Sequence, residues 1–162
     1  MGFGDNFGFD FGGTFSFSDI ETAIITALEA QSIFQVVKTY AGELSKDIPG
    51  LPLKYPSAFV VYNGSKFEWV DTKTGMETAT FDVLVCARSF KTDLGVNEDV
   101  RQNVNAGAYM LIKAVMYALA WQTLGLALTL PLKPVDIKMI AATNTMVIYG
   151  LSFEAAFDRD YA

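Results

Sequence analysis

The chain has 162 residues and a formal net charge of −6, with 51% hydrophobic and 19% charged residues. This composition predicts one globular domain with a sizeable core and argues against a protein that binds nucleic acid through clustered lysines and arginines. The chain has no histidine and only one cysteine, Cys86, which excludes histidine-based catalysis, disulfides within the chain and the usual zinc sites. The first residues lack the basic and apolar segments of a secretory signal, so we expect synthesis in the cytoplasm.

Residues 1–17 form a compositional region of their own. Phenylalanines alternate there with glycines, whose backbone entropy disfavours a stable helix or a long strand. So many aromatic rings are unusual in a solvated tail. We therefore expect a flexible arm that docks either on a neighbouring subunit or on its own domain. Its candidate interface residues are Phe3, Phe7, Phe9, Phe11, Phe15 and Phe17.

A first helix is predicted directly after this arm. Ser18 and Glu21 have the spacing of a capping box, so the helix is expected to start at Ser18. Apolar residues recur every three or four positions from Ile20 to Leu28. This spacing predicts an amphipathic helix with one side against the core.

Alternating apolar and polar residues predict six strands, at 34–40, 57–62, 65–72, 77–90, 135–142 and 147–157. The pair Asn63-Gly64 separates the second strand from the third and is a strong signal for a tight hairpin turn, because both residues tolerate positive φ. Prolines and glycines predict a loop at 41–56 and an irregular segment at 123–134. The short links between strands indicate antiparallel pairing.

Two aromatic residues of the third predicted strand are further interface candidates. Phe67 and Trp69 are two positions apart, so their side chains are expected on the same face of the strand. Aromatic residues exposed in this way favour an interface with another protein. Packing within the domain is the alternative.

A long helix is predicted from Asn97, as the N-cap, to Trp121. Its apolar residues lie on all sides, which is typical of a helix that is deeply buried, inserted in a membrane or shared with a partner. Lys113 in the apolar part and the missing basic flank argue against a membrane span. We expect one side to cover the sheet and the other to contact the first helix or a neighbouring subunit. The candidate contact residues are Tyr109, Met116 and Tyr117.

The order of predicted elements is arm, helix, four strands, helix and two strands. This order predicts an α+β fold, with a mainly antiparallel sheet of about six strands and two helices packed on one face. We expect two parts, a flexible Phe/Gly-rich N-terminal arm at residues 1–17 and a single domain at residues 18–162.

The residues offer no arrangement that predicts catalysis. Cys86 lies within a predicted strand, without a histidine to lower its pKa, and is interpreted as a small buried apolar residue. Asp82 and Arg88 share a face of that strand but lie about 20 Å apart along it. The charged residues at 158–160 are interpreted as a solvated C-terminal segment. We therefore predict no catalytic, metal or cofactor site and no enzymatic activity.

Four segments carry a resemblance to a known family, and the dipeptide Ile20-Glu21 fits the same pattern. The segments are SAFVVYNG (57–64), FDVLVCARS (81–89), GAYML (107–111) and MVIYGLSF (146–153). In order and spacing they resemble the tail-terminator (tail-completion) proteins of Mu-like contractile-tailed bacteriophages. The resemblance covers roughly residues 18–157.

This resemblance implies a structural virion protein of the tail and neck, assembled in the host cytoplasm. Tail terminators form a six-fold ring on the head-proximal end of the tail tube, stop tube growth and join the tube to the neck. The implied partners are further copies of the chain, the tail tube protein, the neck or head-connector protein and the tail sheath protein. The resemblance also implies that DNA passes through the ring lumen without specific binding. The alternatives are another neck or head–tail connector protein of the virion, and a membrane-associated protein that uses the helix at 97–121.

Overall fold

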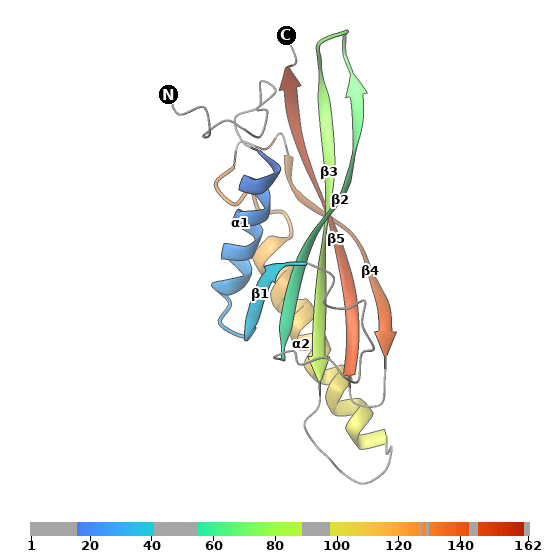
Figure 1. The fold of residues 1–162 in the computed structure, drawn as a ribbon. Coiled ribbons are helices and arrows are strands. Elements are labelled where there is room, and N and C mark those ends of the chain that lie inside the picture. Colours follow the sequence, from blue (N-terminus) through green and yellow to red (C-terminus); the bar gives the residue numbers. More distant parts are fainter. Residues whose placement is uncertain are drawn as a thin grey trace.

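The computed structural model describes residues 16–40, 55–88, 98–126, 128, 130–142 and 146–160. Two helices and a five-stranded sheet form an α+β fold, as predicted (Figure 1). The elements in chain order are α1 (Phe17–Glu29), β1 (Val36–Thr39), β2 (Ser57–Trp69), β3 (Thr74–Arg88), α2 (Glu98–Leu119), β4 (Leu130–Ala142) and β5 (Met146–Asp160).

The strands lie in the order β1-β2-β3-β5-β4, and the sheet is strongly twisted. Strands β3 and β5 pair along their whole length, from Thr74 opposite Asp160 to Arg88 opposite Met146. The pairing is antiparallel, as expected, except between β1 and β2, which run parallel. A parallel pair needs a connection of a dozen or more residues, and the 17 positions from 40 to 56 between these two strands provide it.

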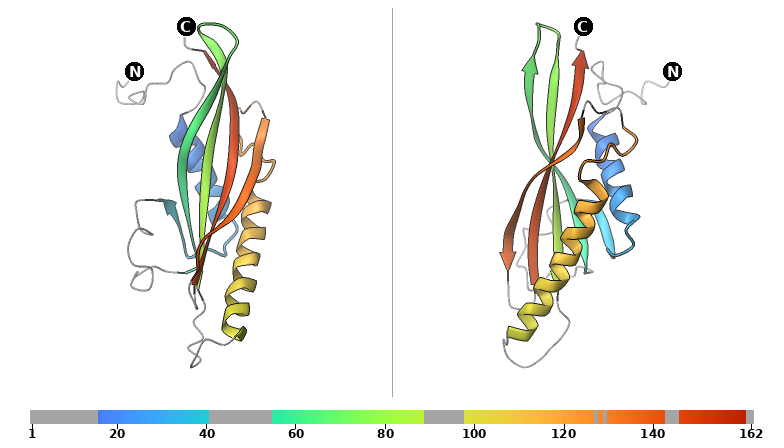
Figure 2. Two further views of the ribbon diagram at one scale, coloured as in Figure 1. Left: turned by 90° about the vertical axis from the view of Figure 1, so that its right-hand side faces the viewer. Right: turned by 180° about the vertical axis from the view of Figure 1, so that it is seen from behind.

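Both helices pack on one face of the sheet, as predicted. Ile24 of α1 and Val115 of α2 are fully buried in one cluster with alternate residues of the central strands, such as Val83 and Leu151. Helix α1 contacts β1 and β2, whereas α2 crosses β3 and β5 (Figure 2). A smaller cluster, which includes Phe59, lies on the opposite face of the sheet.

The prediction of a hairpin turn at Asn63-Gly64 is wrong. Strand β2 continues through this pair with a bulge, and Gly64 has a φ of 110°. Positive φ serves a bulge as well as a turn, so the dipeptide does not distinguish the two. The chain reverses at Asp71 instead, where Asp71 Oδ1 accepts hydrogen bonds of 2.8 Å from the backbone N–H groups of Lys73 and Thr74. Two predicted strands are therefore one, which accounts for five strands instead of six.

Two element boundaries also differ from the predictions. Helix α1 has Ser16 as its N-cap, and the capping box is completed by Asp19 rather than by Glu21. The same spacing of three residues thus occurs two positions earlier, with aspartate in place of glutamate. Strand β4 begins at Leu130, inside the segment predicted to be irregular, because an edge strand tolerates prolines. The predicted N-cap at Asn97 lies outside the described residues.

In the described part of the chain, no helix is both long enough and apolar enough to cross a lipid bilayer. The buried side chains in the described part of α2 face the core: Ala108, Leu111, Val115, Ala118 and Leu119.

Candidate interaction surfaces

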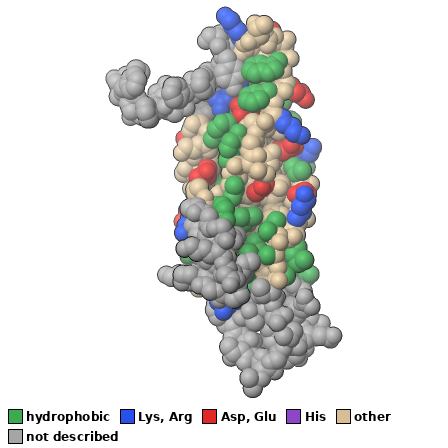
Figure 3. Space-filling view, turned by 45° about the vertical axis from the view of Figure 1, so that its right-hand side comes forward, with side chains coloured by type: hydrophobic (Ala, Val, Ile, Leu, Met, Phe, Trp, Pro, Cys, Tyr) green, Lys and Arg blue, Asp and Glu red, His purple; other side chains and the backbone are tan. Residues whose placement is uncertain are grey.

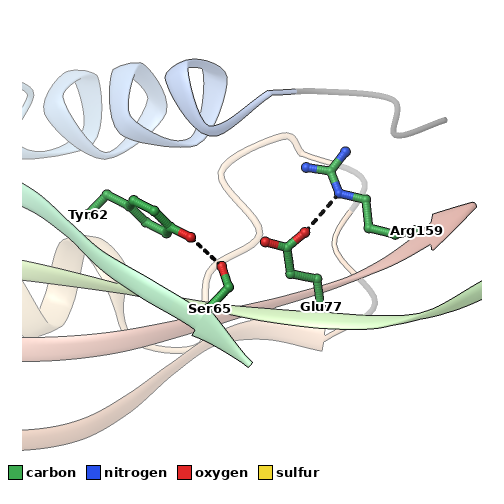
Figure 4. Close-up of polar contacts among 4 residues, drawn as sticks. All are labelled: Tyr62, Ser65, Glu77 and Arg159. Atoms are coloured by element: carbon green, nitrogen blue, oxygen red, sulfur yellow. Dashed lines mark hydrogen bonds and ion pairs between the residues drawn. The ribbon is translucent and has the colours of Figure 1, made fainter. Parts of the chain in front are cut away.

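A buried ion pair lies beneath the start of α1 (Figure 4). Arg159 Nε is 3.1 Å from Glu77 Oε1, and the two side chains are only 7% and 3% exposed. The guanidinium carbon of Arg159 is also 4.5 Å from the ring centroid of Phe157 and 5.7 Å from that of Phe17. The prediction of a solvated segment at 158–160 is therefore wrong for Arg159, because β5 extends to Asp160 and carries this side chain into the core.

Phe17, which was assigned to the N-terminal arm, is the first residue of α1, and its partly buried ring packs against the core beside this ion pair. Its ring stacks on that of Tyr62, with the centroids 4.5 Å apart, and the Tyr62 hydroxyl is hydrogen-bonded to Ser65 (Figure 4). These contacts therefore anchor the chain where the first 15 residues join the domain. The other arm phenylalanines, at positions 3, 7, 9, 11 and 15, lie outside the described residues.

The single thiol of the chain is inaccessible. Cys86 is fully buried in the smaller cluster, as predicted. Burial raises the pKa of this thiol to about 11, and the Ser57 hydroxyl opposes that effect only in part. The thiolate needed for nucleophilic attack is thus disfavoured.

The acidic residues form no metal site in the part of the chain described here. Within it, no three side chains of Asp, Glu, His or Cys lie close enough together to hold a metal ion. Asp82, considered above with Arg88, instead accepts a hydrogen bond of 2.6 Å from the Ser152 hydroxyl of β5. Arg88 lies with its guanidinium carbon 5.8 Å from the ring centroid of Tyr55.

The outward side of α2 carries large exposed apolar side chains. Tyr117 is 79% exposed, Met110 is 72% exposed and Tyr109 is more than half exposed, as is Trp121 just beyond the end of the helix. Of the three residues singled out from the sequence, Tyr117 points outward and Met116 packs against the core. Tyr109 is exposed, but its ring lies 6.5 Å from that of Tyr149 on β5. The all-round apolar pattern predicted a second surface but could not divide the residues between its two sides.

The end of the β2–β3 hairpin is a second exposed apolar surface. Phe67 and Trp69 stack on each other with ring centroids 5.5 Å apart and planes at 3°, on the same face of β2. Trp69 is 54% exposed, and the neighbouring Val70 projects almost completely into solvent. On the face of the molecule drawn in Figure 3, hydrophobic side chains gather at several separate places.

Strand β4 is a third exposed apolar surface, which the sequence analysis missed. In the described part of the chain, β4 pairs only with β5, and neither helix packs on it closely. Ile137 and Met139 lie opposite Leu151 and Tyr149, on the face that the helices cover elsewhere, yet both are exposed. Ile140, on the other face, is exposed as well. The predicted strand at 135–142 has apolar residues on both faces, and this pattern could have indicated an exposed apolar surface.

An apolar groove of about 620 Å³ runs between α2, the end of β3 and the link from α1 to β1. Met110, Ala114 and Tyr117 of α2 form one wall, and Ile33, Pro56 and Ala87 contribute to the other. Two cationic side chains, Arg88 and Lys113, also line it. The groove therefore combines apolar walls with positive charge, a property that was not predicted from the sequence.

Comparison with known proteins identifies one family. The family model described as Bacteriophage Mu, Gp37 matches residues 16–158. The match begins at the N-cap of α1 and ends within β5, so it spans both helices and the sheet. No curated protein matches the chain in sequence.

Proposed function

The chain belongs to the bacteriophage Mu Gp37 family, and from this premise we propose that it is the tail terminator of a Mu-like phage. The family makes it a structural protein associated with the virion. In the proposal, six copies form a ring on the head-proximal end of the tail tube, stop its growth and join it to the neck or head connector. The tail tube protein, the connector protein and the tail sheath protein are the proposed partners.

The observation that carries this proposal is the distribution of exposed apolar side chains. A subunit that associates head to tail in a ring needs two different surfaces for its neighbours, and a further one for the tube. The outward side of α2, the hairpin end and β4 supply three exposed apolar surfaces on separate elements of the fold, which supports this arrangement. Large exposed apolar areas on a protein of this size favour contacts with other proteins.

Charge and thiol chemistry support a conduit without catalysis. With a net charge of −6, the ring would not attract the phosphates of DNA that passes through its lumen. The one thiol is buried with a raised pKa, so it would not act as a nucleophile. We therefore propose that the protein acts through its surfaces and needs no cofactor.

Deletion of the gene in its phage tests this function. We expect tail tubes of abnormal or unlimited length, which a plasmid copy of the wild-type gene corrects. Tubes of normal length beside filled, tailless heads would favour a connector protein instead.

Native mass measurement with and without tube ends provides the second test, because persistent monomers in both conditions would contradict a ring. Recovery of the protein in a membrane pellet would support the remaining alternative.

A further inference from the structure

The apolar groove beside α2 has the size and lining of a site for another chain. Its volume of about 620 Å³ lies within the range of protein pockets that enclose a ligand. Tyr117 and Met110, the two most exposed apolar residues among the described side chains of α2, both line it. An occupant would therefore cover the part of α2 that is least compatible with water.

The lining also indicates the chemistry of that occupant. Ile33, Ala114 and Tyr117 offer apolar contacts, and Lys113 and Arg88 add two positive charges. A fitting ligand thus carries apolar or aromatic groups with acidic groups close by. A basic or purely polar segment would lose the apolar contacts and be repelled by the cations.

One segment of this chain has that composition. Residues 1–15 contain five phenylalanines, all at odd positions, together with Asp5 and Asp10 and no lysine or arginine. In an extended segment, residues two apart point to the same side, so Phe7, Phe9 and Phe11 would project together. We propose that the groove receives these phenylalanine side chains from the N-terminal arm of a neighbouring copy, an inference that rests on the proposed ring.

The position of the groove favours a neighbouring copy over the same chain. The arm joins α1 at Ser16, whereas the groove is lined by Gln31 and Ile33, just beyond the other end of that helix. The 13 residues of α1 span about 20 Å. An arm that folded back along its own helix would use about six residues on that distance, at 3.3–3.6 Å per residue. Only Phe3, Phe7 and Phe9 of the same chain could then reach the groove, whereas the arm of an adjacent subunit does not have to span α1 and can place Phe11 there as well.

Photo-crosslinking of the full chain tests the inference. Phe9 is replaced by benzoylphenylalanine in an unlabelled protein, which is assembled with an excess of ¹⁵N-labelled wild-type protein and then irradiated. We expect most crosslinked products to join the unlabelled arm to ¹⁵N-labelled peptides that contain residues 107–117 or 31–33. Crosslinks mainly to unlabelled peptides, or to other parts of the domain, would overturn the inference.

Variants of the groove provide the controls. Ala114→Trp fills the groove and is expected to lower the crosslink yield severalfold. Thr26→Trp adds the same side chain to the exposed side of α1, outside the groove, and is expected to leave the yield unchanged. Because Ala114→Trp can disturb packing, Tyr117→Ala is the second variant, and its side chain is too exposed to affect folding much. An unchanged yield in both groove variants would also refute arm docking at this site.

The native mass of the same samples separates this inference from the proposed function. A six-fold ring whose arm crosslinks map elsewhere would overturn the docking site and leave the terminator proposal intact. Monomers in the presence of tube ends would contradict the ring, and with it the docking of an arm from a second copy.

Reversing the charge of Lys113 tests the electrostatic part of the inference independently. Lys113→Glu is expected to lower the crosslink yield, and adding Asp5→Lys and Asp10→Lys to it is expected to restore much of that yield.

Discussion

Arg159 near the C-terminal end of β5 is bound to Glu77 of β3, with Arg159 Nε 3.1 Å from Glu77 Oε1 in the interior of the protein. The guanidinium group also lies against the rings of Phe157 and Phe17. The pair therefore links the last strand, the long hairpin arm and the first residue of α1 at one point. This contact therefore holds the start of α1, from which the N-terminal arm extends, against the ends of β3 and β5.

Removal of either partner of this ion pair is expected to destabilise the domain strongly. Glu77→Ala or Arg159→Met leaves a buried charge without its partner, which costs about 3–5 kcal/mol. The double variant should lose less than the sum of the two, since it leaves neither charge behind. Urea unfolding of all three variants measures these differences. For comparison, Lys138→Ala breaks the exposed pair with Asp136 and should change stability by about 0–1 kcal/mol. Additive losses at Glu77 and Arg159 would contradict the coupling.

Two glycine-to-alanine substitutions are expected to have effects of opposite sign. Gly64 has a φ of 110° in the bulge of β2, so Gly64→Ala should destabilise the domain by about 1–3 kcal/mol. Gly107 lies in α2, where an added Cβ meets nothing within 4 Å. Gly107→Ala should stabilise the domain by up to about 1 kcal/mol, because alanine favours the helix. Thermal unfolding followed by circular dichroism measures both. A neutral Gly64→Ala would argue against the bulge.

The stability of the domain is expected to fall at alkaline pH, in part through Cys86. Burial raises the pKa of this thiol from 9.0 to about 11, so the folded state retains the proton more strongly than the unfolded state. The stabilisation is complete below about pH 9 and is lost as the pH rises to about 11 and above, by about 2–3 kcal/mol in total. Tyr149, whose pKa is raised by partial burial and by Tyr109, acts in the same direction.

Cys86→Ala isolates the contribution of the thiol. The variant is less stable at neutral pH because it removes a buried atom, but its unfolding free energy should decline less between pH 8 and pH 12 than that of the wild type. Urea unfolding at a series of pH values provides the comparison. Parallel curves for the two proteins would show that Cys86 does not contribute to the alkaline loss.

The aromatic pair at the hairpin end is expected to serve assembly rather than folding. Replacing Phe67 and Trp69 by serine removes a stacked but exposed pair, so the unfolding free energy should change by less than about 1 kcal/mol. Binding to tube ends, or ring formation, should weaken severalfold if this surface belongs to an interface. The matched control is Lys66→Ser with Glu68→Ser, which alters the alternate exposed residues of the same strand without changing the net charge. Equal losses of assembly in both double variants would argue against a specific role of the aromatic rings.

Periodic stretches were predictable because their signal is contained in a few neighbouring residues. The stripe from Ile20 to Leu28 and the alternation in β5 identified a helix and a strand whose burial follows that pattern. Tyr109 and Tyr117 of α2 are exposed, and their contact with a neighbouring subunit stays a prediction. Met116 packs against the core instead, because the exact rotation of a helix depends on what it packs against.

Features that depend on distant residues were not predictable in the same way. The class of fold, the buried thiol and a second apolar side of α2 were all predictable from local patterns in the chain. Long-range contacts instead determine the bulge at Asn63-Gly64 and the exposure of Ile137 and Met139 on β4. They also bring together Glu77 and Arg159, which lie 82 positions apart in the chain. Periodicity reports the environment of a segment, whereas strand order and buried ion pairs arise from contacts between segments that are far apart in the chain.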